Sequence, residues 1–421
     1  MSGAGRIVVV GAGQAGARVC EGLRREGFAG SLTLVGAEAH LPYERPPLSK
    51  DVLLGKGAPE AGEIHDRDFY RSNEVDLRLS TRAVAIDRAA QRVRTESGEA
   101  IPYDKLVLAL GVRPRPLPLA GATGTLSLRT RDDALALLSA LGQGRSLLVI
   151  GGGFLGLEVV AAARQLGTKV LLVEQANSLL PRVVAPEIGD FYRRLHAGNG
   201  VEIKTGVTVT DIGGGKSAGE EAVAKLGDGS LFQGTAIVAA IGSLPNTDLA
   251  ESAGLAVRDG ILVDAAGRTS DPGIWAAGDC TRYRHPILGR EVRLESWHNA
   301  ETQARVVAAG LCGKAAELSE LPWFWSDQYA TNLQIVGYPD RWDRIVTRGD
   351  PASGRFVAFY LREGKLVAAN TINSGRDIRA CRELILSGRT LDPAALADPA
   401  QDIKKLSQGA PIASPPHAQL A

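Results

Sequence analysis

One arrangement constrains the fold of this chain more than any other: an apolar strand that leads directly into a glycine-rich turn and a helix. Residues 6–10, RIVVV, are apolar and mostly β-branched, as in parallel strands buried on both faces. GAGQAG follows, with Gly11, Gly13 and Gly16, and then a helical stretch and a second strand over 31–35. This order of strand, glycine turn, helix and strand is the context in which GxGxxG binds the diphosphate of a dinucleotide.

Each glycine of such a turn has its own physical task. Gly11 permits the tight turn, Gly13 has no Cβ to obstruct a diphosphate, and Gly16 lets helix and strand pack closely. The diphosphate then meets the unpaired N–H groups and the positive dipole of the helix N-terminus. A single GxGxxG is nevertheless a weak signal, because structural glycine turns imitate it.

The arrangement occurs a second time. The strand 146–150 leads into GGGFLG, with Gly151, Gly153 and Gly156, and the next strand ends in Glu174. An acid there accepts hydrogen bonds from an adenosine ribose and repels a 2′-phosphate, which favours NAD over NADP. After the first motif the acid is displaced, and Glu38 is the candidate for the ribose contact.

Two motifs in context predict two dinucleotides in one chain; the alternative is a duplicated fold in which one copy has lost its ligand. Chemistry between two dinucleotides suggests electron transfer, and NADH with FAD is the natural pair.

The rest of the chain predicts two domain boundaries and a third domain. Two apolar strands, over 103–111 and from 235, each end at a glycine beside proline-containing turns, the second glycine being Gly242. From about 316, successive strands and a helix over 377–388 indicate an α+β domain with an antiparallel sheet. Residues 213–221 are expected to form a turn and 408–421 a loose tail.

We therefore expect an α/β protein with two Rossmann-like dinucleotide-binding domains of the glutathione-reductase-like type and a C-terminal α+β domain. The predicted domains are an FAD-binding domain (1–112 and 245–317), an NAD-binding domain (113–244) and the C-terminal domain (318–421).

Composition argues against several classes of protein. The 48 Lys and Arg against 47 Asp and Glu leave a net charge of +1, which gives no global attraction to nucleic acid or to an anionic membrane. The four cysteines stand far apart without a CxxC, so we expect no disulfide framework and no metal site. No apolar run approaches the ~18 residues of a membrane helix, and no signal peptide is visible. We expect a cytoplasmic protein.

The combination of motifs resembles a known group of flavoproteins. Two dinucleotide folds, a strand ending in AAGD (276–279) and a C-terminal α+β domain resemble the glutathione-reductase-like superfamily. The segments LPYERPPLSKD (41–51) and LPWFWSDQY (321–329) are similar to the oxygenase-coupled NADH-dependent ferredoxin reductases. The resemblance implies FAD in the first fold, NADH in the second and a [2Fe–2S] ferredoxin as acceptor. That ferredoxin serves a cytochrome P450 or a Rieske-type oxygenase, and the reductase is a monomer or weak dimer.

The resemblance also implies site residues. Lys50 lies near N5 of the flavin, Arg45 and Pro47 shape its loop, and Glu158 faces the nicotinamide and can pair with Lys50. Asp279 binds the ribityl or phosphate part of FAD, although a lone Gly-Asp is more often an ordinary turn. The other implied FAD contacts are Ala15, Ala37 (where a related sequence carries Asp), Ala83, Arg129 and Trp297, and Gly242 is added to the NAD contacts.

Two further features concern the electron acceptor. Trp323 and Trp325 stand at strand spacing, which puts both indoles on one face. Core packing is the ordinary explanation; the resemblance implies an aromatic lid near the flavin, with Trp325 as the catalytic candidate. Ferredoxins are acidic, so a basic docking rim is expected, and Arg305 is its first candidate unless it simply solvates a helix face. His298 is interpreted as structural and Cys280 as core filler.

Alternative functions remain open at this point. Residues 41–52 hold no cysteine, which argues against the disulfide, peroxide and coenzyme A-disulfide chemistry of this superfamily. An NADH oxidase or an NADH:small-acceptor reductase would share the fold. A signalling flavoprotein resembling apoptosis-inducing factor would need a basic surface or a targeting extension, and the net charge weighs against it.

Overall fold

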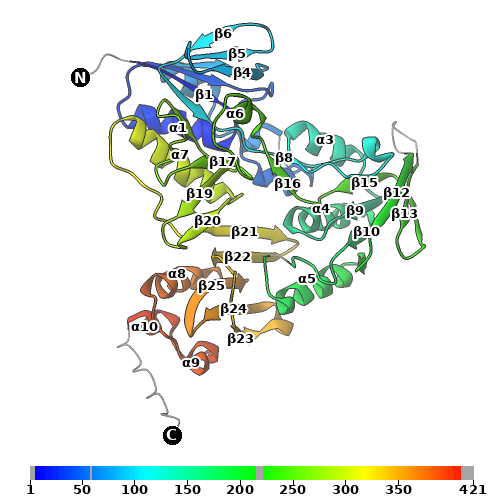
Figure 1. Ribbon diagram of the computed structural model, residues 1–421. Coiled ribbons are helices and arrows are strands. Elements are labelled where there is room, and N and C mark those ends of the chain that lie inside the picture. The colour runs from blue at the N-terminus through cyan, green and yellow to red at the C-terminus, as the bar shows by residue number, and fades with distance from the viewer. Residues whose placement is uncertain (1–4, 57–58, 182, 215–220, 409–421) are drawn as a thin grey trace. The chain divides into compact units, whose positions relative to one another are not determined.

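The computed structural model describes residues 5–56, 59–181, 183–214 and 221–408 (Figure 1). The chain divides into two compact units, one of Met1–Gln175 with Asn199–Glu320 and one of Ala176–Gly198 with Leu321–Ala421. The predicted turn at 213–221 and the predicted tail at 408–421 lie almost entirely outside the described residues.

The first unit contains a five-stranded parallel sheet in the order β18-β7-β1-β2-β3. Its strands are β1 (Arg6–Val10), β2 (Ser31–Val35), β3 (Val75–Arg78), β7 (Lys105–Leu108) and β18 (Ile274–Ala276). In both β1 and β2 every residue after the first is buried, which is why these runs show no polar alternation.

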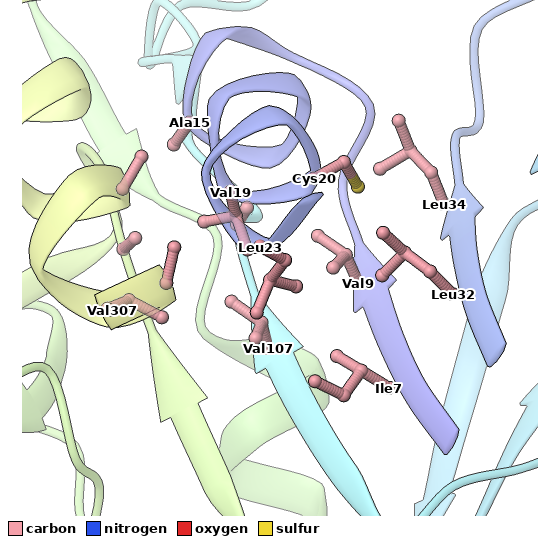
Figure 2. Close-up of a cluster of buried hydrophobic side chains, with 14 of the residues drawn as sticks. Ile7, Val9, Ala15, Val19, Cys20, Leu23, Leu32, Leu34, Val107 and Val307 are labelled. Atoms are coloured by element: carbon pink, nitrogen blue, oxygen red, sulfur yellow. The ribbon is translucent and has the colours of Figure 1, made fainter. Parts of the chain in front are cut away.

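Helices α1 (Gln14–Arg25) and α7 (Trp297–Leu311) pack against this sheet. Figure 2 shows Val19 and Leu23 of α1 in one buried cluster with Val9 of β1 and Val307 of α7. The cluster fixes the start of α1 above the carboxyl end of β1, which is the position that a dinucleotide-binding turn requires.

A second parallel sheet, in the order β11-β10-β9-β15, repeats the plan. Its strands are β9 (Ser146–Ile150), β10 (Lys169–Glu174), β11 (Glu202–Thr205) and β15 (Ala236–Ala239). Helix α4 (Phe154–Gln165) follows β9 as α1 follows β1, and its residues from Gly156 to Ala163 are all buried. Both predicted strand–turn–helix–strand units are therefore present.

Smaller elements complete the first unit. The short antiparallel sheets are β4 (Ala83–Asp87) with β5 (Arg92–Thr95) and β6 (Ala100–Pro102), and β12 (Val209–Gly214) with β13 (Ala222–Leu226) and β14 (Leu231–Gly234). A mixed sheet consists of β17 (Ile261–Val263), β19 (Thr281–His285) and β20 (Arg290–Val292). The remaining helices are α2 (Arg67–Ser72), α3 (Arg131–Ser139) and α6 (Asp248–Ser252).

Two strands lie where the sequence predicts the chain to cross between dinucleotide domains. β8 (Val112–Pro114) pairs antiparallel with β16 (Ser243–Pro245), so the outgoing and returning segments run side by side. The domain boundaries themselves stay a prediction.

The second unit is built on a five-stranded antiparallel sheet in the order β21-β22-β25-β24-β23. Its strands are β21 (Trp323–Gln328), β22 (Thr331–Gly337), β23 (Arg344–Asp350), β24 (Arg355–Arg362) and β25 (Lys365–Ile372). Its helices are α5 (Pro186–Gly198), α8 (Ile378–Ser387), α9 (Pro393–Ala397) and α10 (Ile403–Gln408).

Helix α5 is the element whose packing the sequence did not indicate. It falls inside the span 113–244, yet its contacts are with the C-terminal sheet. The rings of Phe191 and Phe356 meet edge to face at 5.5 Å, and the Tyr360 hydroxyl accepts a hydrogen bond from Ala185 N at 2.9 Å. The predicted α/β fold class with its C-terminal α+β part is confirmed. Among the residues that the structure describes, no helix is long and apolar enough to cross a bilayer.

Candidate functional site

The two glycine turns have the same construction. Gly11 has a φ of +112°, and a Cβ on it would lie 2.1 Å from the Ala109 carbonyl oxygen. A Cβ on Gly16 would lie 1.9 Å from the Gly11 carbonyl oxygen, whereas one on Gly13 would meet nothing within 4 Å. Gly11 and Gly16 are thus required by the backbone, and Gly13 leaves open space.

The second turn repeats these relationships. Gly151 has a φ of +108°, and its Cβ would lie 2.4 Å from the Ala240 carbonyl oxygen. A Cβ on Gly156 would lie 2.1 Å from the Gly151 carbonyl oxygen, and again one on Gly153 would meet nothing within 4 Å. An open middle position between two backbone-locked glycines is what close approach of a diphosphate needs.

Both helices that follow begin without a side-chain cap. Gly13 is the N-cap of α1 and Gly153 that of α4, and neither first turn contains an acidic residue. Glycine at the N-cap offers no capping side chain to either helix, and the positive end of each helix dipole faces the open position. The residues present fit a dinucleotide at each turn.

The two candidate acids for ribose contacts have different surroundings. Glu174, at the end of β10, accepts a hydrogen bond from Gly152 N at 2.7 Å, so its carboxylate lies beside the second turn. Glu38 accepts hydrogen bonds from Arg45 Nη2 and from the Tyr43 hydroxyl, both at 2.6 Å. Burial acts to raise the pKa of Glu38, but its bonds to Arg45 and Tyr43 outweigh burial and lower it. Ala37, next to it, is exposed.

The expected pairing of Lys50 with Glu158 is present. Lys50 Nζ lies 3.1 Å from Glu158 Oε2, and the Ser49 hydroxyl donates to the same oxygen. Glu158 is 7% exposed and belongs to α4, whereas Ser49 ends the 3-10 turn η1 (Pro46–Ser49), which contains Pro47. The ion pair therefore joins the segment 41–51 to the helix of the second motif.

Asp279, which the sequence predicts as an FAD contact, lies beside the first motif. Gly278 has a φ of +85°, and a Cβ on it would lie 3.0 Å from Cβ of Ala15, so the AAGD turn touches the start of α1. Asp279 Oδ2 is 3.5 Å from Arg129 Nη2. Burial raises the pKa of Asp279 and lowers that of Arg129, and the attraction between them partly offsets both effects.

The remaining candidates are distributed around this site. Arg45 Nη1 donates to the Arg129 carbonyl oxygen at 2.8 Å, which links Glu38 to Asp279 through two arginines. Trp297 Nε1 donates to Glu44 Oε1 at 3.2 Å and holds the start of α7 against the segment 41–51. Ala83 begins β4. Gly242, exposed and with a φ of +108°, precedes β16.

Sequence reasoning missed two residues that organise the site, and Tyr43 is the first of them. Tyr43 is 3% exposed, and its hydroxyl donates to Glu38 and accepts from Arg131 N at 2.8 Å. The guanidinium carbons of Arg45 and Arg131 lie 4.4 and 4.7 Å from the centre of its ring. Ser49 is the second such residue. Both residues lie inside the segment 41–51, whose similarity to the family was the signal that could have pointed to them. The sequence of that segment does not indicate which residues they contact.

The docking candidates lie in different units of the chain. Trp323 and Trp325 share one face of β21 and stack, with ring centres 5.1 Å apart and planes 19° apart. Arg305 on α7 has a 52% exposed side chain, and its Nη2 lies 2.6 Å from Glu320 Oε1. His298 Nε2 lies 3.3 Å from the other oxygen of the same carboxylate.

The cysteines provide no redox pair in the described part of the chain. All four are free thiols, and Cys20, Cys280 and Cys381 are buried. Burial raises the pKa of Cys20 and Cys381 to about 12 and that of Cys280 to about 11, so these thiols are not nucleophilic at neutral pH. Within the described ranges, no three His, Cys, Asp or Glu side chains gather as metal ligands would.

Comparison with known proteins gives matches along the whole chain. The family described as Pyridine nucleotide-disulphide oxidoreductase matches residues 5–304, and the family described as Reductase C-terminal matches residues 323–407. The anthranilate 1,2-dioxygenase system ferredoxin–NAD(+) reductase component of Burkholderia cepacia is 44% identical over 401 residues, which are 94% of this chain and 98% of that protein. Putidaredoxin reductase CamA of Pseudomonas putida is 39% identical over 405 residues, with 95% and 96% coverage.

Solved structures give the same picture. The crystal structure of the covalent putidaredoxin reductase–putidaredoxin complex superimposes with a TM-score of 0.91 at 38% identity, covering 96% of this chain and 98% of that one. The ferredoxin reductase for the CYP199A2 system from Rhodopseudomonas palustris also gives a TM-score of 0.91 at 38% identity, covering 96% and 99%. Because the first family match covers more than half of the residues, this chain belongs to the pyridine nucleotide-disulphide oxidoreductase family, and it also carries a Reductase C-terminal domain.

Proposed function

We propose that this protein is an NADH-dependent ferredoxin reductase, which passes electrons from NADH through bound FAD to a [2Fe–2S] ferredoxin. That ferredoxin would supply a cytochrome P450 or a Rieske-type oxygenase. The observation that carries the proposal is the presence of two glycine turns with glycine N-caps, together with the Lys50–Glu158 ion pair that joins the segment 41–51 to the helix of the second turn. Near-full-length relatives named as ferredoxin–NAD(+) reductases support it. We place the activity in the cytoplasm, where NADH is supplied.

The first turn would hold FAD. The N–H groups at the start of α1 would bind its diphosphate beside Gly13, with Asp279 and Arg129 orienting the part next to Ala15. Bound FAD supplies the chemistry of accepting a hydride and releasing single electrons. Lys50 contributes a positive charge that stabilises electron density near it, in a position where only 20% of its side chain is exposed.

The second turn would hold NADH. The start of α4 would bind the diphosphate beside Gly153, and Glu174 would accept from the adenosine ribose. Glu158 is the fifth residue of α4, the helix that would bind the nucleotide. Its carboxylate contacts Lys50, in the segment that would lie next to the flavin. Its role is to hold that ammonium group in place.

The acceptor side of the proposal rests on Trp325 and Arg305. A stacked indole pair presents a polarisable surface to a docking protein, and the exposed Arg305 guanidinium offers a cation to an acidic one. Among the alternative functions, reduction of a small disulfide acceptor is disfavoured, because the buried, high-pKa thiols offer no disulfide relay.

The decisive experiment starts with the purified protein. It should be yellow, and NADH should bleach it under anaerobic conditions. Turnover of NADH should then be fast with cytochrome c only when a [2Fe–2S] ferredoxin of an oxygenase system is added, and a panel that includes putidaredoxin provides the acceptors. Fast turnover on oxygen alone would instead establish an NADH oxidase.

A charge reversal tests the acceptor side. Arg305→Glu should slow ferredoxin reduction about tenfold or more, because a cation that meets an acidic partner becomes an anion. Dye reduction by NADH should stay normal. The matched control is Arg94→Glu, a reversal of an exposed arginine on β5 in the same unit. Equal losses in the ferredoxin and dye assays would remove Arg305 from the docking surface.

A further inference from the structure

The exposed guanidinium of Arg305 is already held by a carboxylate of its own chain. Its Nη2 lies 2.6 Å from Glu320 Oε1, and the Glu320 side chain is 28% exposed. The second oxygen of that carboxylate, Oε2, lies 3.3 Å from His298 Nε2. Glu320 therefore bridges Arg305 and His298, and an anion that approached Arg305 would have to take the place of Glu320.

The surroundings of the pair are also balanced in charge. Arg305, His298 and Glu320 line a cavity of about 230 Å³ with residues of α1 and α7. Arg18 in its wall is bound by Glu21 at 2.7 Å and by Glu301 at 2.6 Å. The lining contains three arginines and three glutamates, so the surface around Arg305 is balanced in charge, whereas a basic docking rim is expected for an acidic ferredoxin.

We propose that Glu320 is an internal competitor for the acidic side chains of the ferredoxin. In the free protein Glu320 forms an ion pair with Arg305. When the ferredoxin docks, one of its carboxylates replaces Glu320 at the guanidinium, and Glu320 keeps its contact with His298. This inference rests on the proposed function and identifies Glu320 as the residue that regulates ferredoxin binding at Arg305.

The exchange of Glu320 for another carboxylate favours a partner with several acidic groups over a single anion. A half-exposed ion pair is weak, so a partner carboxylate can displace Glu320 with little loss. A lone anion gains equally little by doing so, whereas a protein surface that places several acidic groups at once gains at each of them. The competitor thus lowers the affinity for every anion and leaves the multiply acidic partner favoured, which is selectivity by a built-in repulsive element.

The test removes the competing charge and asks whether the gain passes through Arg305. Glu320→Gln should raise the second-order rate constant for ferredoxin reduction about two- to fivefold at low salt, the size of one exposed ion pair. The gain should shrink as salt is added, because exposed charges are screened. Rates of NADH-dependent dye reduction should be unchanged. Glu320→Ala is the second variant, and the backbone oxygen of residue 320 keeps its bond to His285 Nε2 in both.

Two controls separate competition for Arg305 from a general change in the electrostatic potential of the surface. Glu301→Gln removes the same charge from the same cavity without touching Arg305, and its effect should be clearly smaller. In an Arg305→Ala background, Glu320→Gln should give no gain. A gain that persists there would overturn the proposal, because it would not pass through Arg305. A loss of rate on removing Glu320 would also overturn it, and would make Glu320 a support for Arg305.

The failure of this inference can be told apart from the failure of the proposed function. Wild-type protein that reduces dye but no ferredoxin overturns the proposed function and the competitor with it. Wild-type protein that reduces ferredoxin, with both Glu320 variants at the wild-type rate, overturns only the competitor.

Discussion

Lys50 Nζ lies 3.1 Å from Glu158 Oε2, although the two residues are far apart in the sequence and follow different glycine turns. Both side chains are largely out of solvent, at 20% and 8% exposure, and the Ser49 hydroxyl completes the set on the same oxygen. A shielded pair of this kind costs desolvation and is kept only with good partners. It joins the segment 41–51 to the helix of the second glycine turn, which is where the proposed function brings the two nucleotides together.

Glu158→Gln should keep the shape of the site but leave the Lys50 ammonium without its counter-charge. We expect anaerobic flavin reduction by NADH, followed by stopped-flow absorbance, to slow at least about tenfold, the equivalent of one misplaced charge–charge contact. The flavin content should be unchanged. Ser49→Ala removes a hydrogen bond but no charge and should have a smaller effect. A Glu158→Gln rate equal to wild type would show that the carboxylate has no part in the reduction.

The glycine turns separate a binding role from a folding role within one motif. Gly153→Ala places a methyl group where nothing lies within 4 Å, so the fold should persist while the diphosphate loses its approach. The KM for NADH should rise about tenfold or more, with normal FAD content. Gly156→Ala places a methyl group 2.1 Å from a carbonyl oxygen and should lower the unfolding temperature instead. Equal unfolding temperatures for the two variants would contradict this division.

The parts of the fold that could be predicted from the sequence are those determined by residues adjacent in the chain. β1, the Gly11 turn and α1 follow one another directly, and their apolar and glycine pattern carries the local backbone geometry. The Gly278–Asp279 turn was reached only through its resemblance to a family motif. The structure then supplied the reason, the contact of Gly278 with Ala15 across the sheet.

The parts that it missed depend on partners that no local pattern announces. Tyr43 is one aromatic residue in a loop, and its role follows from Glu38 and Arg131 arriving at the same hydroxyl. Arg305 is readable as an exposed helical cation, but its pairing with Glu320 depends on how the chain turns back after α7. Helix α5 has an ordinary amphipathic pattern, and which sheet it covers is decided by Phe191 meeting Phe356.

Nucleotide selectivity can be tested at the end of β10. Glu174→Ala removes the carboxylate that would repel a 2′-phosphate, so NADH should bind more weakly and NADPH should become usable. We expect the ratio of kcat/KM for NADH to that for NADPH to fall about tenfold or more. Glu202→Ala is the control, an exposed acid on the neighbouring strand β11. An unchanged ratio in Glu174→Ala would remove this residue from the ribose site.

The pH dependence of stability can be tested at His196, which is 0% exposed in α5. Its Nε2 donates to Gln328 Oε1 at 2.8 Å, and burial lowers its pKa from 6.5 to about 4, an effect that the Gln328 bond only partly opposes. In the unfolded chain this histidine takes up a proton near pH 6.5, whereas in the folded protein it stays neutral until about pH 4. The contribution of His196 is thus fully present above pH 6.5 and is lost as the pH falls through that window.

Over that window the free energy of unfolding should fall by roughly 3 kcal/mol on account of this residue alone. The measurement is urea unfolding at several pH values between 7 and 4.5, for wild type and for His196→Gln, which cannot take up the proton. The variant should be less stable at pH 7, because it loses a fitted buried ring, yet its stability should depend less steeply on pH. Parallel pH profiles for the two proteins would mean that another group carries the acid sensitivity, since carboxylates titrate in both and cancel in the difference.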